Sequence, residues 1–256
     1  MTERTERLSL GEVEAIVRDA LMRAGCDAQA ASECAKVIRR AERNNARDHG
    51  LGRVPRLLEG LHMSAIDGAA QPVLSRALPT SLHVDAAGGF SDFAISIGFE
   101  TLTEVSRSYG AALMTVSQTG DLPIAGPWLD RLAERHSIAM SVASAGANEI
   151  VFPASGGRVT VPADGLPHEL SLRFLLALTG SRPSAGITSE LPFTKASNAT
   201  VCFIAIQPAA DAAAGVPTME DFELRDEAVE RARRQHEADT EGVRVSSDLL
   251  VRILTS

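Results

Sequence analysis

The sequence predicts an α/β protein in which a helical N-terminal unit precedes a central mixed α/β layer. Apolar residues recur at helical spacing through roughly the first sixty positions. From about residue 80, β-branched runs alternate with helical segments, which is the order expected of an α/β layer. Hydrophobic residues make up 45% of the 256 residues, enough for a sizeable core.

Charge and cysteine content limit the possible partners and compartment. A net charge of −8, from 25 basic and 33 acidic side chains, argues against nucleic acid or an anionic membrane, because both need a positive surface. The three cysteines have no CxxC spacing, so neither a disulfide framework nor a zinc site is expected. The stretch MTERTERLSL lacks the apolar core of a signal peptide, and no apolar run reaches transmembrane length. We therefore expect a soluble cytoplasmic protein, which could still take a small anionic substrate.

The first expected elements are three helices. Ser9 and Glu12 have the spacing of a capping box, and an apolar stripe follows at helical period until Gly25. A second helix is expected over residues 28–47 and a third over residues 55–61.

The stretch NNARDHGLGRVPRLLEGL, residues 44–61, predicts a break between the second and third helices. Gly50 is a poor helix residue, and Pro55 fits best in a first helical turn. His49 and Arg53 would then lie on irregular backbone, where an imidazole and a guanidinium could serve an anionic substrate that needs a proton. An ordinary turn with a surface histidine is the other interpretation, and these residues alone favour it.

The central layer is expected to alternate strands and helices. Strands are predicted over residues 81–85, 111–117, 137–144 and 199–208, and helices over 91–109 and 127–136. Further along the chain we expect a Gly/Pro-rich connection over 151–169, a buried helix over 170–178, a charged helical region within 218–242 and a closing helix over 246–254.

General catalytic motifs do not identify the chemistry. GGFSDF is not a GxGxxG fingerprint, and neither a P-loop nor a GxSxG elbow occurs. None of the six histidines pairs at ligand spacing with another histidine or a carboxylate on an obvious helix face, so no metal site is expected.

The order of segments resembles the malate/L-lactate dehydrogenase family of the non-Rossmann type, whose members reduce 2-oxo acids or cyclic imino acids. Its pattern of a polar helix end, Ser-His-Gly, Arg and an apolar helix is matched by Asp48-His49-Gly50 and Arg53, with Asp48 in place of Ser. The resemblance continues through LHVDAAGGFSDFAISIGFETLTEVSRSYGAALMTVSQTGD, RLAERHSIAMSVASA, TVCFIAIQPAA and EGVRVSSDLLVRIL.

The chain also departs from the family pattern. The family places His-x-Gly where this chain has Gln118-Thr119-Gly120, and its Gly-Thr-Asn-Pro loop has no counterpart. In the stretch similar to the family's Pro-Gly-Gly-Lys-Gly-Tyr-Gly-Leu segment, Pro167-His168 occupies the lysine position. The chain is shorter than the family pattern, and the missing part falls between Ala154 and Val161.

The resemblance implies a fold and a set of residue roles. The fold would be the family's non-Rossmann one with a trimmed cofactor region, in which residues 1–75 pack with 209–256 and residues 76–208 form the central α/β domain. His49 would donate the proton, helped by Asp48. Arg53 and Gln118 would bind the substrate. The residues that would contact NADH or NADPH are Thr119, Gly120 and His168, and the protein would be a homodimer with sites near the subunit boundary.

Three functions stay open at this point. The first is NAD(P)H-dependent reduction of a small 2-oxo acid or cyclic imino acid. The second is a cofactor-independent acid–base enzyme on the same scaffold, such as a tautomerase, cyclase or lyase, because nicotinamide-binding segments are missing. The third is a non-catalytic binding protein.

Overall fold

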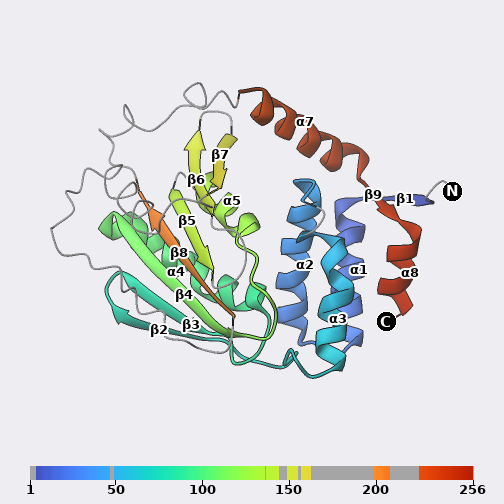
Figure 1. The fold of residues 1–256 in the computed structure, drawn as a ribbon, viewed down its shortest axis with the longest axis horizontal. Coiled ribbons are helices and arrows are strands. Elements are labelled where there is room, and N and C mark those ends of the chain that lie inside the picture. The colour runs from blue at the N-terminus through green and yellow to red at the C-terminus, as the bar shows by residue number, and fades with distance from the viewer. Residues whose placement is uncertain are drawn as a thin grey trace.

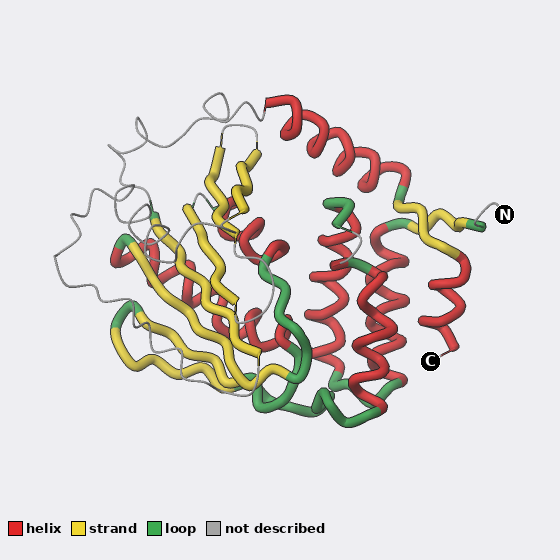
Figure 2. The backbone as a smooth tube through the Cα atoms, viewed as in Figure 1, coloured by secondary structure: helices red, strands yellow, loops and turns green. Residues whose placement is uncertain are grey.

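The computed structural model describes residues 4–46, 49–135, 137–143, 149–154, 157–162, 199–207 and 225–255. In these ranges a helical unit lies beside a seven-stranded sheet, as the predicted α/β class requires (Figures 1 and 2). The helices are α1 Leu10–Arg23, α2 Ala28–Arg43, α3 Val54–His62, α4 Ser91–Tyr109, α5 Gly126–Glu134, α7 Arg225–Glu241 and α8 Ser247–Thr255. The strands are β1 Thr5–Leu8, β2 Val73–Leu78, β3 Ser81–Asp85, β4 Ala111–Thr119, β5 Ile138–Ala143, β6 Glu149–Ala154, β7 Gly157–Pro162, β8 Ala199–Ile206 and β9 Val243–Ser246.

The predicted capping box at the start of α1 is confirmed. The Glu12 amide donates to Ser9 Oγ at 3.2 Å, and the Ser9 amide donates to Glu12 Oε2 at 2.8 Å. Two amides that the first helical turn leaves without a partner are thereby satisfied. The second helix, α2, ends at Arg43, earlier than the predicted residue 47, since Asn45 is left-handed with φ 56°.

The C-terminal elements return to the helical unit. Strand β1 pairs antiparallel with β9, and neither strand was predicted, because both are short and largely polar. Leu250 and Ile253 of α8 share one apolar cluster with Val13 and Val17 of α1. Figure 1 shows α8 beside α1, at the far side of the helical unit from the sheet. The division of the chain into the two predicted domains stays a prediction.

The large sheet has the strand order β2-β3-β4-β8-β5-β6-β7. Among the described pairings β3 and β4 are parallel and the others are antiparallel. This mixed sheet is not the doubly wound parallel arrangement of a Rossmann fold.

Helix α4 was predicted with its observed bounds, and it positions the rest of the central layer. Gly110 ends the helix in the left-handed region with φ 85°, as a C-terminal glycine commonly does. At Gly98 a side chain would collide with Met114 of β4 and Val84 of β3, so this glycine lets the helix lie close against the sheet. Phe90 and Phe93, at the start of α4, are buried in the cluster of the helical unit. The helix therefore contacts both the sheet and the helical unit.

The expected Gly/Pro-rich connection over 151–169 is wrong in its first part. Strands β6 and β7 form an antiparallel hairpin there, from Glu149↔Pro162 to Ala154↔Gly157. Pro153 and Pro162 obscured this hairpin, because proline cannot donate to a strand ladder. The strands predicted over 81–85, 111–117, 137–144 and 199–208 and the helix over 127–136 are present within a few residues of their predicted ends. The predicted helix over 170–178 lies outside the described residues.

Candidate functional site

The predicted break between the second and third helices is present and has a defined geometry. After α2 the chain forms a 3-10 helix over Leu51–Arg53, and α3 begins at Val54 with Pro55 in its first turn. The Leu51 amide donates to Glu42 Oε1 at 2.6 Å. A side chain at Gly50 would collide with that Glu42 carboxylate. Because residue 50 is a glycine, the Glu42 side chain at the end of α2 can reach the Leu51 amide and fix the start of the 3-10 helix.

His49 lies on this irregular segment and is exposed to solvent. Its amide donates to the Ala46 carbonyl at 2.9 Å, which fixes the backbone there. An exposed imidazole can exchange protons with solvent or with a bound molecule. Asp48, predicted to orient it, lies outside the described residues, so that role stays a prediction.

The structure places Arg53 in a buried ion-pair network. Nη1 donates to Asp92 Oδ2 at 2.8 Å and Nη2 donates to Asp121 Oδ2 at 2.9 Å, while the residue is only 9% exposed. Two of its three nitrogens thus donate to protein carboxylates. The predicted role of Arg53 as the clamp for a substrate carboxylate stays a prediction.

Further hydrogen bonds tie the two carboxylates to the surrounding elements. The Ser91 amide and hydroxyl donate to Asp121 Oδ1 and Oδ2 at 2.6 and 2.9 Å. Trp128 Nε1, on α5, donates to Asp92 Oδ1 at 3.2 Å. Asp92 lies in the first turn of α4, where the helix dipole favours a negative charge. The network therefore joins α3, the start of α4, the end of β4 and α5.

One guanidinium facing two carboxylates leaves the network with an excess of negative charge. Burial raises the pKa of Asp121 to about 6 and Asp92 adds to this, although Arg53 and Ser91 act in the opposite direction. Burial alone would lower the pKa of Arg53, but Asp92 and Asp121 raise it above its ordinary value. Burial, together with the same two carboxylates, raises the pKa of the Cys34 thiol. Arg53 therefore stays charged, and the pKa of Asp121 lies closer to neutral pH than that of an ordinary aspartate.

Gln118 and Thr119 lie at an irregular end of β4, where the pairing register shifts, and Gly120 begins the turn that follows. Gln118 is left-handed with φ 57°, and its carbonyl accepts from the Gly88 amide at 2.7 Å. The Gly120 amide donates to the Gly89 carbonyl at 2.8 Å, and a side chain at Gly120 would collide with the backbone of Ala65 and Gly88. The turn is therefore packed against the preceding loop.

The predicted role of this turn in cofactor binding stays a prediction. Thr119 is only 8% exposed, and its hydroxyl donates to the Asp121 carbonyl at 2.9 Å. The Gly120 amide is already paired, so neither residue presents a donor to a nicotinamide cofactor in this conformation. His168, the third residue predicted to bind it, lies outside the described residues.

The network residues Asp92, Asp121, Ser91 and Trp128 were not predicted as site residues. Asp121 directly follows the Gln-Thr-Gly turn, and Asp92 begins an apolar helix, so both occupy positions next to a break in secondary structure. A charged residue at such a position is a signal, but a weak one, because a surface aspartate at a helix start has the same pattern.

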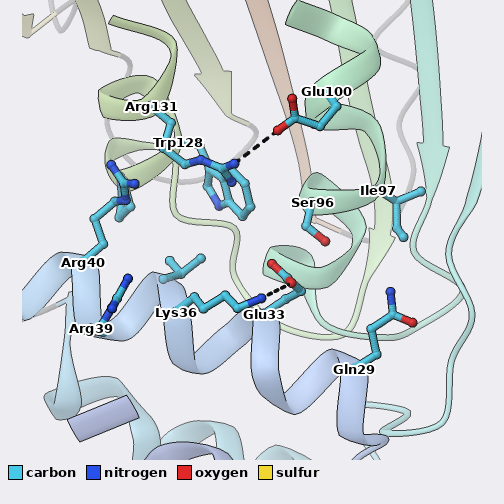
Figure 3. A pocket seen from close by; sticks show the side chains of 12 residues that line it. Gln29, Glu33, Lys36, Arg39, Arg40, Ser96, Ile97, Glu100, Trp128 and Arg131 are labelled. Atoms are coloured by element: carbon cyan, nitrogen blue, oxygen red, sulfur yellow. Dashed lines mark hydrogen bonds and ion pairs between the residues drawn. The ribbon is translucent and has the colours of Figure 1, made fainter. Parts of the chain in front are cut away.

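A cleft of about 420 Å³ opens between α2, α4 and α5 (Figure 3). Trp128 is one of the residues that line the cleft. Its indole N–H also donates to Asp92, so this side chain contacts both the cleft and the buried ion-pair network. Charged side chains from all three helices surround the opening, and none of the predicted site residues lines it.

Among the described residues, no group of three or more His, Cys, Asp or Glu side chains is placed to hold a metal ion. No helix in the described ranges is both long enough and apolar enough to cross a membrane.

The fold is similar to that of solved structures named as dehydrogenases and reductases. It is similar to malate dehydrogenase from Entamoeba histolytica, with a TM-score of 0.74 and 14% identity over 98% of this chain and 96% of the other. It is also similar to Δ1-piperideine-2-carboxylate reductase from Pseudomonas syringae pvar. tomato, with a TM-score of 0.72 and 19% identity over 98% of this chain and 99% of the other. At these identities the likeness shows the fold alone.

The chain belongs to the malate/L-lactate dehydrogenase family, whose sequence profile matches residues 8–162. A Δ1-pyrroline-2-carboxylate reductase from Ancylobacter novellus is 34% identical over 43% of this chain and 32% of its own length. A (2R)-3-sulfolactate dehydrogenase (NADP⁺) from Chromohalobacter salexigens is 28% identical over 54% of this chain and 41% of its own length. The segments matched in these curated relatives cover between 32% and 50% of each relative's own length.

The raised pKa of Asp121 predicts a specific pH dependence of stability. The folded value is about 6 and the ordinary value is 3.8, so between these pH values the folded protein keeps a proton that the unfolded chain has lost. The contribution of Asp121 to the free energy of unfolding therefore falls as the pH rises through this interval. Denaturant unfolding of the wild type and of Asp121→Asn, from about pH 4 to 7, measures it. The stability advantage of the wild type over the variant should shrink with rising pH.

Asp239→Asn provides the control for this measurement. Arg43 lowers the pKa of Asp239, which is exposed, so this carboxylate stays ionised over most of the same interval. Its stability difference from the wild type should stay nearly constant. A wild-type advantage over Asp121→Asn that is constant or grows with pH would contradict the assignment of Asp121.

Proposed function

We propose that this protein is an oxidoreductase that reduces a small cyclic imino acid or 2-oxo acid with NADH or NADPH. Membership of the malate/L-lactate dehydrogenase family over residues 8–162 carries this proposal. The relatives matched there include Δ1-pyrroline-2-carboxylate reductases and a sulfolactate dehydrogenase, whose names imply reduction or oxidation at a carbon next to a carboxylate. As part of the same proposal, the substrate is a small anion and the active species is a homodimer.

His49 is the residue that we propose as the proton donor. Its position on the break between α2 and α3 supports this role, because irregular backbone leaves the imidazole accessible and a substrate can approach it. Reduction of a C=N or C=O group requires a proton on the nitrogen or oxygen, and histidine is the side chain that most often supplies it. The exposed state of His49 is compatible with that exchange.

Arg53 is not part of this proposal as a substrate clamp. Its guanidinium is buried and donates to Asp92 and Asp121, so in this conformation it contributes to the position of the break and not to an open anion site. Thr119 and Gly120 are likewise left out of this proposal, because the Thr119 hydroxyl and the Gly120 amide already have partners within the protein.

The proposal is tested by a reductase assay on the purified chain. Oxidation of NADH or NADPH would be followed by absorbance with Δ1-pyrroline-2-carboxylate, Δ1-piperideine-2-carboxylate and pyruvate, and with (2R)-3-sulfolactate and NADP⁺ in the reverse direction. Calorimetric titration with each nucleotide measures binding, and light scattering measures the oligomeric state. We expect saturable binding of one nucleotide at submillimolar concentration, roughly the weak end of useful affinity, and turnover of at least one substrate. A folded protein that binds neither nucleotide would contradict the proposal.

Replacement of His49 separates a proton donor from a surface histidine. His49→Ala should lower turnover of the identified substrate by about 10²–10⁴-fold, the range expected for the loss of general acid catalysis. Thermal stability should change little, because the side chain is exposed. His62→Ala, at the exposed end of α3, is the matched control and should keep wild-type turnover. Wild-type activity in His49→Ala would remove this histidine from the mechanism.

A further inference from the structure

Cationic side chains outnumber carboxylates in the lining of the cleft between α2, α4 and α5, although the chain as a whole carries a net charge of −8 and each of these cations has an ion-pair partner. Four cationic and two anionic side chains line it, which gives the lining an excess of two positive charges. The cations are Lys36, Arg39, Arg40 and Arg131, and the carboxylates are Glu33 and Glu100. Figure 3 shows Arg40 extending from α2 towards Arg131 on α5. A local excess of this sign attracts small anions.

Among the described residues, Arg39 and Arg40 of α2 form surface ion pairs. Arg40 Nη1 donates to Glu134 at 2.8 Å, and Arg39 Nε lies 3.2 Å from Glu14. Neither of these glutamates lines the cleft. Exposed pairs of this kind contribute about 0–1 kcal/mol, so a ligand with more than one negative charge can compete for the arginines.

Arg131 is held in place by two aromatic rings and by Glu100, whose Oε1 lies 3.4 Å from Nη2. Its Cζ lies 4.1 Å from the centre of the Phe99 ring and 5.0 Å from that of Trp128, so its side chain is ordered before any ligand arrives. Burial, with repulsion from Arg40 and Arg135, lowers the pKa of Arg131. A bound anion between Arg40 and Arg131 would relieve that repulsion.

The rest of the lining indicates the size and chemistry of the ligand. A volume of about 420 Å³ is that of a small-molecule site. Val37, Ile97, Pro127 and Trp128 give the cleft apolar walls beside its cationic rim. Phosphate matches this rim better than a single carboxylate does, because it carries up to two charges and offers oxygens in the geometry that guanidinium groups bind.

We propose that the α2/α4/α5 cleft binds the phosphate of a small phosphorylated molecule, with Arg40 and Arg131 as its principal ligands and the apolar walls against its carbon body. The phosphate could belong to a nicotinamide nucleotide or to a separate metabolite, which share this chemistry. The proposal does not rest on the reductase activity, because phosphate binding at this cleft can be measured without turnover and none of the predicted site residues lines it.

Inorganic pyrophosphate is the probe for this site. Trp128 is the one tryptophan of the chain and lines the cleft, so its fluorescence reports binding there, with calorimetry as the second measurement. We expect saturable binding to the full chain at low ionic strength and weaker binding as salt is added. Arg40→Gln should weaken it roughly tenfold or more, as expected for the loss of a charge-assisted hydrogen bond. Lys36→Gln is a second variant on the cleft and should weaken it in the same direction.

Arg233→Gln is the matched control, because Arg233 is an exposed arginine of α7 that pairs with Glu230 and does not line the cleft. It should bind pyrophosphate as the wild type does, and circular dichroism should show all variants folded.

Competition with NADPH then distinguishes the two sources of phosphate. If NADPH displaces pyrophosphate, the cleft is assigned to the nucleotide, and if it does not, the cleft is assigned to another metabolite. The proposal is overturned if pyrophosphate does not saturate, or if Arg40→Gln, Lys36→Gln and Arg233→Gln bind it equally. A different result would make this surface a contact between two copies of the chain: pyrophosphate does not bind, and light scattering shows a dimer for the wild type but not for Arg40→Gln.

Discussion

The Arg53 guanidinium between Asp92 and Asp121 is the interaction on which the arrangement of this protein depends. A buried carboxylate pair is unfavourable unless a cation and hydrogen bonds compensate it, and Arg53 is the cation that the described residues supply. The three side chains come from the start of α3, the first turn of α4 and the turn after β4. Helix α4 also lies against the sheet, and Phe90 and Phe93 at its start are buried in the helical unit. The network therefore fixes the joint, that is, the contact between the helical unit and the sheet.

The same joint positions the functional features of the chain. His49 lies on the segment that leads into Arg53, and the turn at Gly120 leads into Asp121. Trp128 connects the network to the cationic cleft, because its indole N–H donates to Asp92 while the ring lines the cleft. The family relationship is carried mainly by residues 8–162, which include these features. A reductase built on this scaffold would therefore place its proton donor, its central ion pairs and a phosphate site on one connected framework.

Local patterns predicted much of the fold, but not the environment of Arg53. Helix α4 and its terminal Gly110 follow from apolar periodicity and one glycine, and the break after α2 follows from Gly50 and Pro55. The network could not be predicted in this way, because its partners are 39 and 68 residues apart in sequence. Sequence indicates that an arginine follows the histidine, but only the tertiary structure shows that carboxylates already occupy it. Strands β6 and β7 were missed because their prolines are typical of loops.

A double-mutant cycle on Arg53 and Asp92 tests this account most directly. The free energy of unfolding would be measured by denaturant titration for the wild type, Arg53→Met, Asp92→Asn and the double variant at neutral pH. Arg53→Met should destabilise by about 3–5 kcal/mol, because it leaves two buried carboxylates without their cation. The double variant should be more stable than the sum of the single losses implies, with a coupling of about 1–3 kcal/mol. Effects that add to within about 0.5 kcal/mol would show that Arg53 and Asp92 do not hold this joint together.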